Sequence, residues 1–381
     1  MDPNLGSTSD INLSNDCLLN IYEKIQGSRD RNSFGLTCRH WLQVQNLAVK
    51  SLIFHFSDNP KVYRLYASYL PRLLTRFPNL SSISVAGCTE LPDSELIRIR
   101  DCGSKLRSLA LYCCFGITDN GLSLVSAGCP NLVSVTLYRC NITDPGLESL
   151  ATSCHSLENL NLSYCTLITD HGISILSREC NKLHAVMISY CRSITGTGFR
   201  GCSPTLSYLE ADSCVLSPEG LSGVVRGGGL EYLNLSNLRY WNGVDGLGAI
   251  GDGFATSLRF LNLRMCRFVS DDSVVAIAKG CPLLEEWSLA VCHEVRTTGW
   301  AAIGSDCKSL KVLHVNRCRN FCDRGLQSLR DGCSQLRLLY MHGCRRVSCL
   351  GFEIFSMLRQ DVEVRNDERM SVGPCIDDLF A

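Results

Sequence analysis

A segment of about 26 residues recurs along most of this chain, and the repetition limits its possible folds more than any other feature. From Leu80 onward the sequence returns to the pattern Leu-x-x-Leu-x-Leu-x-x-Cys-x-x-Ile-Thr-Asp-x-Gly-Leu, followed by a short apolar stretch ending in Cys. A unit of this length cannot bury an apolar face alone, so the repetition predicts a solenoid whose units pack against their neighbours. The eleven copies begin at Leu80, Leu106, Leu132, Leu157, Leu183, Leu206, Leu230, Leu258, Leu284, Leu310 and Leu336.

Each copy carries the pattern of one strand followed by one helix. The first part alternates like a half-buried strand, and Ile-Thr-Asp-x-Gly-Leu is typical of a helix start. Crossovers between parallel strands are right-handed, and helices are wider than strands are spaced. The sequence therefore predicts an α/β fold, a right-handed parallel β/α solenoid curved into a horseshoe, with a concave sheet on the order of 50 Å long. The expected helix caps are Thr118, Thr143, Thr169, Ser217 and Ser270, with Asp119, Asp144, Asp170 and Asp271 favoured by the positive helix end.

The chain has 24 cysteines, and 18 of them occupy fixed places in the repeat. Ten lie eight residues after the first Leu, where a small apolar side chain with a weak S–H donor fits under the neighbouring turn. Eight more close a predicted helix. Because no two cysteines are spaced as Cys-x-x-Cys, we expect reduced thiols that pack, with metal or redox chemistry as the alternative. The two sets are Cys88, Cys114, Cys140, Cys165, Cys191, Cys214, Cys266, Cys292, Cys318 and Cys344, and Cys102, Cys129, Cys154, Cys180, Cys202, Cys281, Cys307 and Cys333.

The first 79 residues do not follow the repeat. Ser14 is a candidate N-cap for a helix with apolar residues at 18, 19, 22 and 25, and a second helix is expected from Ser28 through Phe34 and Leu36 to Cys38. A third helix carries Trp41, Leu42, Val44 and Leu47. Three short helices make a poor core alone, so this all-helical module needs the solenoid, a partner, or both.

The run Leu13 … Leu18-Leu19 … Ile21-Tyr22 … Ile25 … Leu36-Thr37-Cys38-Arg39-His40-Trp41 resembles an F-box, whose members bind the Skp1 adaptor of cullin-based ubiquitin ligases. The repeats resemble cysteine-containing leucine-rich repeats, and the whole chain is similar to F-box/leucine-rich-repeat proteins, plant members especially. The resemblance implies a non-catalytic substrate receptor that docks on Skp1 and, through it, on cullin. It places Leu13, Leu18, Leu19, Ile21, Tyr22, Ile25, Leu36 and Trp41 in Skp1 binding.

Two alternatives stay open beside this function. The N-terminal helices could serve only as a cap on the first repeat of a scaffold unrelated to ubiquitin, because solenoids need capping. The chain could also be a small-molecule receptor, because some plant relatives bind hormones on the concave face. This array has fewer repeats than those relatives and no long insert that could cover a pocket.

The domain organisation follows from these patterns. We expect a disordered tail over 1–10, the F-box over 11–50, and an irregular first repeat over 51–79 with a strand at 51–56 and a helix at 60–77. The eleven repeats span 80–358, and a cap and tail occupy 359–381. A last strand is predicted at 362–364, and the polar tail after it is expected to cover the sheet edge.

Charge and motifs exclude several classes of function. With 37 basic and 37 acidic residues, the chain lacks the one-signed field that nucleic acids or anionic membranes require. No phosphate-binding loop, zinc-protease helix or nucleophile elbow occurs, so we expect neither catalysis nor a cofactor or metal. The N-terminus has no secretory signal and no apolar run could span a bilayer, which predicts a nuclear or cytoplasmic protein.

Recognition of a protein substrate should fall on concave positions that alternate with the buried leucines. Repeats eight to eleven carry basic residues, so we expect an acidic or phosphorylated substrate segment there, because Arg pairs bidentately with carboxylate or phosphate. An ordinary solvated face is the alternative. Trp241, in the lengthened turn of repeat seven, is a further candidate. The candidate concave contacts are Tyr112, Tyr138, Tyr164 and Tyr190 early in the array and Arg264, His314, Arg317 and His342 late in it.

Overall fold

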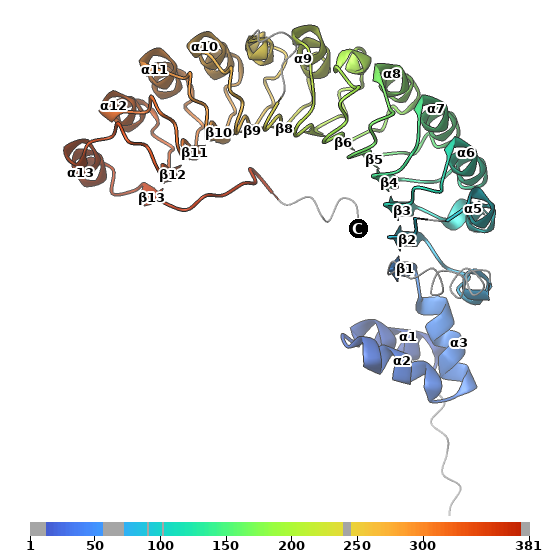
Figure 1. The fold of residues 1–381 in the computed structure, drawn as a ribbon. Helices are drawn as coiled ribbons and strands as arrows, with labels where there is room; N and C mark the ends of the chain where they lie inside the picture. Colours follow the sequence, from blue (N-terminus) through green and yellow to red (C-terminus); the bar gives the residue numbers. More distant parts are fainter. Residues whose placement is uncertain (1–12, 56–71, 90, 101–102, 239–244, 375–381) are drawn as a thin grey trace, which may run out of the picture.

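The computed structural model describes residues 13–55, 72–89, 91–100, 103–238 and 245–374. The described residues from 51 onward form a horseshoe with one parallel sheet along its inner side and helices along its outer side, and three N-terminal helices lie beyond its first strand (Figure 1). The predicted α/β solenoid is therefore confirmed. Trp241 and the expected disordered tail at 1–10 lie outside the described residues.

The sheet has 13 strands in the order of the sequence, and every neighbouring pair is parallel. Equivalent apolar residues of successive repeats face each other, as Leu109, Val135 and Leu160 do, and all three are fully buried. The strands are β1 (Ser51–His55), β2 (Ser82–Ala86), β3 (Ser108–Tyr112), β4 (Ser134–Tyr138), β5 (Asn159–Asn161), β6 (Ala185–Met187), β7 (Tyr208–Glu210), β8 (Tyr232–Asn234), β9 (Phe260–Asn262), β10 (Glu286–Ser288), β11 (Val312–His314), β12 (Leu338–Tyr340) and β13 (Glu363–Arg365).

Most repeats close with an α-helix on the outer side, but two use a 3₁₀ turn where the sequence predicted a full helix. The repeat from Leu183 has only 23 residues before the next one, and its η2 (Thr197–Phe199) is a single turn entered through Gly196 at φ 92°. The other is η3 (Leu247–Gly251), and η1 (Gly103–Lys105) follows the first outer helix. The outer α-helices are α5 (Asp93–Arg100), α6 (Asp119–Gly128), α7 (Asp144–Ser153), α8 (Asp170–Glu179), α9 (Pro218–Val225), α10 (Asp271–Gly280), α11 (Thr297–Asp306), α12 (Asp323–Gly332) and α13 (Cys349–Leu358).

The cysteines after the strands connect each repeat to the one before it. The Cys165 thiol donates to the Leu137 carbonyl at 2.8 Å, and Cys191 donates to Leu162 at 3.0 Å. The same bond recurs at 3.0–3.1 Å from Cys214, Cys266, Cys292, Cys318 and Cys344. The packing role expected for these cysteines is therefore confirmed, with the S–H group as a donor.

The sequence suggested that the aspartates at the helix starts interact with the positive helix end. In the structure they also bond to the next repeat. The Asp144 carboxylate accepts hydrogen bonds from the backbone N–H of Thr169 at 2.8 Å and from its hydroxyl at 2.5 Å, in the next repeat. A Cβ atom on Gly172 would lie 2.6 Å from this carboxylate, which explains the Gly of the motif. The same backbone contact, at 2.6–2.9 Å, is made by Asp93, Asp119, Asp170, Asp245, Asp271 and Asp323.

The N-terminal module contains the three predicted helices, α1 (Asn15–Lys24), α2 (Ser28–Leu36) and α3 (Arg39–Ala48). Ser14 caps α1 through its hydroxyl, as expected, whereas Cys38 precedes α3 instead of ending α2. Asn79 donates to the Leu47 carbonyl at 3.0 Å, which ties the module to the first repeat. The helix expected at 60–77 lies largely outside the described residues, and only 72–76 is seen as helical.

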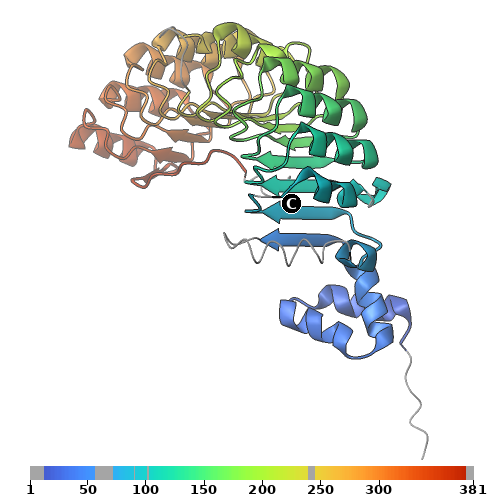
Figure 2. The same cartoon turned by 45° about the vertical axis from the view of Figure 1, so that its right-hand side comes forward.

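The C-terminal segment departs from expectation. β13 pairs with β12 as the predicted last strand, but the residues after it turn inward across the concave side instead of covering the edge (Figures 1 and 2). The reason is that several of its backbone groups find partners on β9 and β10 and just after β11. No described helix is long and apolar enough to cross a membrane.

The aspartate contacts can be tested within one helix. Asp271→Ala removes the acceptor of the Arg296 N–H, 2.6 Å away, and should cost about 1–3 kcal/mol of unfolding free energy. Asp272→Ala, in the same first turn but exposed, loses only its interaction with the helix end and should cost about 1 kcal/mol or less. Urea denaturation measures both losses, and equal losses would contradict the cross-repeat role.

Burial also makes a prediction about the thiols. It raises the pKa of the Cys165 and Cys344 thiols from 9.0 to about 11. Above pH 9 the folded chain therefore binds more protons than the unfolded chain. The contribution of these buried thiols to the free energy of unfolding is present below pH 9 and is lost as the pH rises through 11. Iodoacetamide at pH 8.5 should modify the exposed Cys17 and Cys349 and leave Cys165 unmodified until urea is added, as followed by mass spectrometry. Equal rates for Cys17 and Cys165 in the native chain would refute this.

Candidate functional site: the concave sheet

A left-handed backbone turn follows almost every strand and shapes the rim of the concave sheet. In the part of the chain that the structure describes, nine non-glycine residues have positive φ, between 51° and 65°, and each lies seven residues after the first Leu of its repeat. The turn is held by the next repeat: the N–H of Tyr164 donates to the Ser189 carbonyl at 2.8 Å, and that of Arg317 to His342 at 2.7 Å. The stacked neighbour therefore offsets the strain of this conformation. Tyr164, Tyr190 and Arg317 all occupy such turns.

The four predicted tyrosines form a continuous row. Ring centroids lie 6.0 Å apart between Tyr112 and Tyr138, 5.2 Å between Tyr138 and Tyr164, and 4.3 Å between the stacked Tyr164 and Tyr190. Burial and the neighbouring Tyr190 hydroxyl raise the pKa of Tyr164 to about 12. All four rings remain half-buried, so the row offers aromatic edges to a partner.

A polar cluster around one carboxylate, which the sequence did not single out, occupies the middle of the sheet. The hydroxyls of Tyr208 and Tyr232 donate to the same Glu210 oxygen at 2.9 and 3.0 Å, and the Asn234 amide donates to the other. Burial raises the pKa of Glu210, while these three hydrogen bonds oppose the shift. Tyr208 and Tyr232 stack at 4.0 Å because their strands are neighbours in register.

His314, predicted as a concave contact, is not accessible. Its side chain has no exposed area, its ring stacks on Tyr340 at 4.4 Å, and Nε2 lies 2.8 Å from Glu286 Oε1. The other Glu286 oxygen accepts the backbone N–H of Gly373 at 3.0 Å. Covering by the C-terminal segment therefore turns this position into a buried support for the surface.

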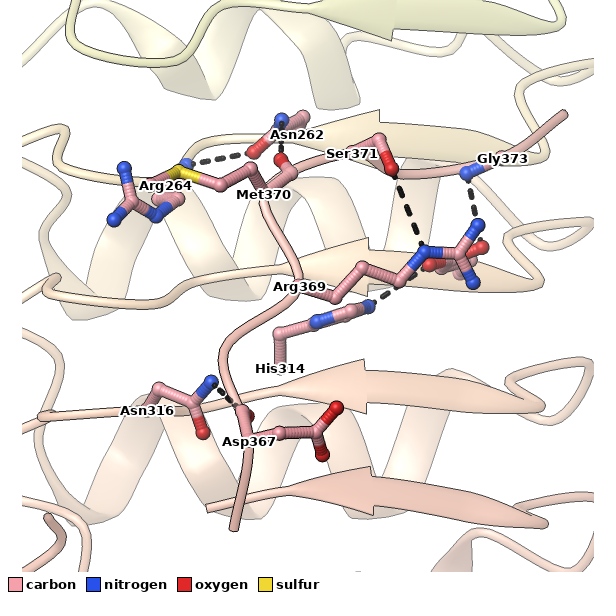
Figure 3. Close-up of polar contacts among 10 residues, drawn as sticks. Asn262, Arg264, His314, Asn316, Asp367, Arg369, Met370, Ser371 and Gly373 are labelled. Atoms are coloured by element: carbon pink, nitrogen blue, oxygen red, sulfur yellow. Dashed lines mark hydrogen bonds and ion pairs between the residues drawn. The ribbon is translucent and has the colours of Figure 1, made fainter. Parts of the chain in front are cut away.

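Residues 366–374, here called the C-terminal arm, lie across β9 to β11 (Figure 3). The Asn316 amide donates to the Asp367 carbonyl at 3.2 Å, and the Asn262 amide donates to the Met370 carbonyl at 3.4 Å. The predicted residues Arg317 and Arg264 both face Glu368 of the arm, at 2.6 and 3.9 Å. The arm thus occupies the part of the sheet where the sequence predicted an acidic substrate segment.

The predicted residue His342 is exposed and lines a basic hollow beside the arm. The hollow has a volume of about 780 Å³. Desolvation, with Arg319 and Arg267 nearby, lowers the pKa of His293 in its wall. Its lining is Val291, His293, Arg317, Arg319, His342, Gly343, Arg345 and Arg346, without a carboxylate.

The adaptor-binding residues predicted in the N-terminal module divide into two groups. Leu18 and Tyr22 are buried in the core of the module with Phe34 and Val44. Leu13, Leu19, Ile25 and Trp41 pack partly against this core. Ile21 and Leu36 are the exposed ones, and Leu36 is 84% exposed.

Sequence reasoning missed the arm and the side chains that hold it. Asn262 stands at a strand position between the buried Leu261 and Leu263, which is the signal that could have identified it, whereas Asn316 lies just after β11. Among the described residues, no group of three or more His, Cys, Asp or Glu side chains could hold a metal ion.

The fold and the concave surface define a leucine-rich-repeat protein with a helical N-terminal module, and comparisons agree. Residues 128–151, 153–177 and 254–278 match the family described as Leucine Rich repeat. An internalin from Listeria monocytogenes shares the fold, with a TM-score of 0.55 and 14% identity over 78% of this chain and 87% of that one.

Two plant relatives narrow the assignment. The chain is 56% identical over 291 residues to F-box/LRR-repeat protein 12 of Arabidopsis thaliana, which covers 74% of this chain and 73% of the relative. It is 30% identical over 148 residues to a transport inhibitor response 1-like protein of Oryza sativa subsp. japonica, covering 35% of this chain and 24% of that protein. The chain belongs to the plant F-box/LRR-repeat family.

Proposed function

We propose that this protein is the substrate-recognition subunit of a Skp1-cullin-F-box ubiquitin ligase, acting in the nucleus or the cytoplasm. The N-terminal module docks on a Skp1-like adaptor, and the concave sheet holds a protein target. The chain contributes no reactive side chain to ubiquitin transfer. It brings the target close to the conjugating machinery, so its contribution to rate is proximity.

The observation that carries this proposal is the N-terminal module of an F-box/LRR-repeat chain. Its core residues Leu18, Tyr22 and Phe34 hold three helices together, yet Ile21 and Leu36 remain exposed. Exposed apolar side chains on a small module attached at the edge of a solenoid suit a protein partner. A module that only capped the first repeat would not need them at its surface.

The docking step is tested by Leu36→Asp. Because Leu36 is 84% exposed, the substitution should leave the fold intact and place a charge in the apolar contact with the adaptor. We expect co-purification of a Skp1-like protein to fall at least tenfold, about 1.4 kcal/mol. Affinity measured by biolayer interferometry with purified Skp1 gives the number.

The matched control is Leu350→Asp in α13, at the other end of the horseshoe, where Leu350 is 66% exposed. It should bind Skp1 as the unaltered chain does. Leu18→Asp is unsuitable because a charge in the module core would unfold it. Undiminished Skp1 binding by Leu36→Asp, or no binding by the unaltered chain, would favour a scaffold with a helical cap.

A further inference from the structure

The C-terminal arm is bound through groups that any extended peptide possesses. Two of its carbonyls, those of Asp367 and Met370, accept hydrogen bonds from side-chain amides of the sheet, and its Gly373 N–H donates to Glu286. The Glu368 side chain of the arm forms ion pairs with Arg264 and Arg317. The sheet therefore recognises an extended backbone and one carboxylate.

The side chains that bind the arm are oriented by the repeats and not by the arm. Asn262 Oδ1 accepts the Arg264 N–H at 3.0 Å, and Asn316 Oδ1 accepts the His342 N–H at 2.8 Å. Each amide therefore points its NH₂ group toward the concave side, whatever lies there. These donors are preorganised for a carbonyl, which lowers the entropy cost of binding an extended segment.

The arm itself is weakly anchored. Residues 366–371 are exposed, and Val372 is the residue of the arm that is buried. Gly373 has φ 72°, and a Cβ atom there would lie 3.0 Å from the Phe260 ring and 3.3 Å from Tyr232. An exposed segment with few apolar contacts belongs to the least stable parts of a fold, so a competing segment can replace it.

We propose that the C-terminal arm is an internal ligand of the concave sheet, and that the surface beneath it binds an extended segment of a partner protein whose carboxylate replaces Glu368 between Arg264 and Arg317. Identifying this partner as a degradation target rests on the proposed function. The binding itself does not, because it needs only the sheet. The arm is covalently attached after β13, so it competes at a high effective concentration and raises the threshold for partner binding.

The test uses the full chain and a fluorescein-labelled peptide that copies residues 366–374. Gly373→Val should release the arm by collision with Phe260 and should bind the peptide at least tenfold more tightly than the unaltered chain, by fluorescence anisotropy. Met370→Ala is the matched control: its side chain is 66% exposed, and the arm uses its carbonyl, so peptide affinity should match the unaltered chain.

A charge reversal tests the carboxylate. In the Gly373→Val chain, Arg264→Glu with Arg317→Glu should weaken the peptide at least tenfold, and a Glu368→Arg peptide should recover the lost affinity. Recovery also shows that the double variant is folded. Should that variant fail to fold, Arg317→Glu alone, with its side chain 60% exposed, gives the same comparison.

Two results would overturn the proposal. Equal peptide affinity for the unaltered and Gly373→Val chains would mean that the arm does not compete, and absence of binding to both would mean that the sheet does not take an extended acidic segment. Skp1 binding measured on the same preparations keeps the two hypotheses apart. Peptide binding without Skp1 binding refutes only the proposed function, and Skp1 binding without peptide binding refutes only this inference.

Discussion

Each repeat of this protein depends on its neighbour to complete its hydrogen bonds and its apolar core. Asp144 satisfies the N–H and hydroxyl of Thr169, Cys165 satisfies the carbonyl of Leu137, and the strand edges pair throughout. These bonds cross from one repeat to the next at the same place each time, so successive repeats can stack in only one register. Interaction between neighbours also holds the left-handed turns after the strands, which non-glycine residues would otherwise adopt only at a cost.

This fixed register also orders the side chains on the concave side of the sheet. Equivalent positions lie side by side on adjacent strands, so similar residues in neighbouring repeats form rows. Tyr112 with Tyr138 and Tyr164 with Tyr190 are two such pairs, which meet in one row, and Tyr208 and Tyr232 with Glu210 form another. In the last repeats Arg264 and Arg317 lie close enough together to face the same carboxylate, Glu368 of the arm. The horseshoe is thus a constant support for three chemically different surfaces.

The N-terminal module shows how a short segment divides its apolar residues between a core and an exposed surface. Its helices are too short to bury everything they carry, so Leu18 and Tyr22 enter a small core while Leu36 stays outside. Sequence spacing predicts which apolar residues share one face of a helix. It does not predict which of them the other helices of the module will cover. The Phe34 ring lies 4.5 Å from Trp41 and 5.2 Å from Tyr22, which settles that choice in favour of a core formed by all three helices.

The sequence by itself determined the solenoid, the strand and most helix positions, the place of the cysteines and the family resemblance, because all of these follow from local patterns repeated eleven times. The pairing of Tyr112 with Tyr138 was also predictable, because both end their strands at the same position of the repeat, whereas Tyr164 and Tyr190 stand one position later. Only the tertiary structure decided that His314 is buried and that Arg264 and Arg317 already face a carboxylate. The physical reason is distance along the chain, because Glu368 lies about a hundred residues from Arg264. Their contact occurs once and is not repeated, so the periodicity of the sequence cannot predict it. It forms only because the chain after the last strand turns inward.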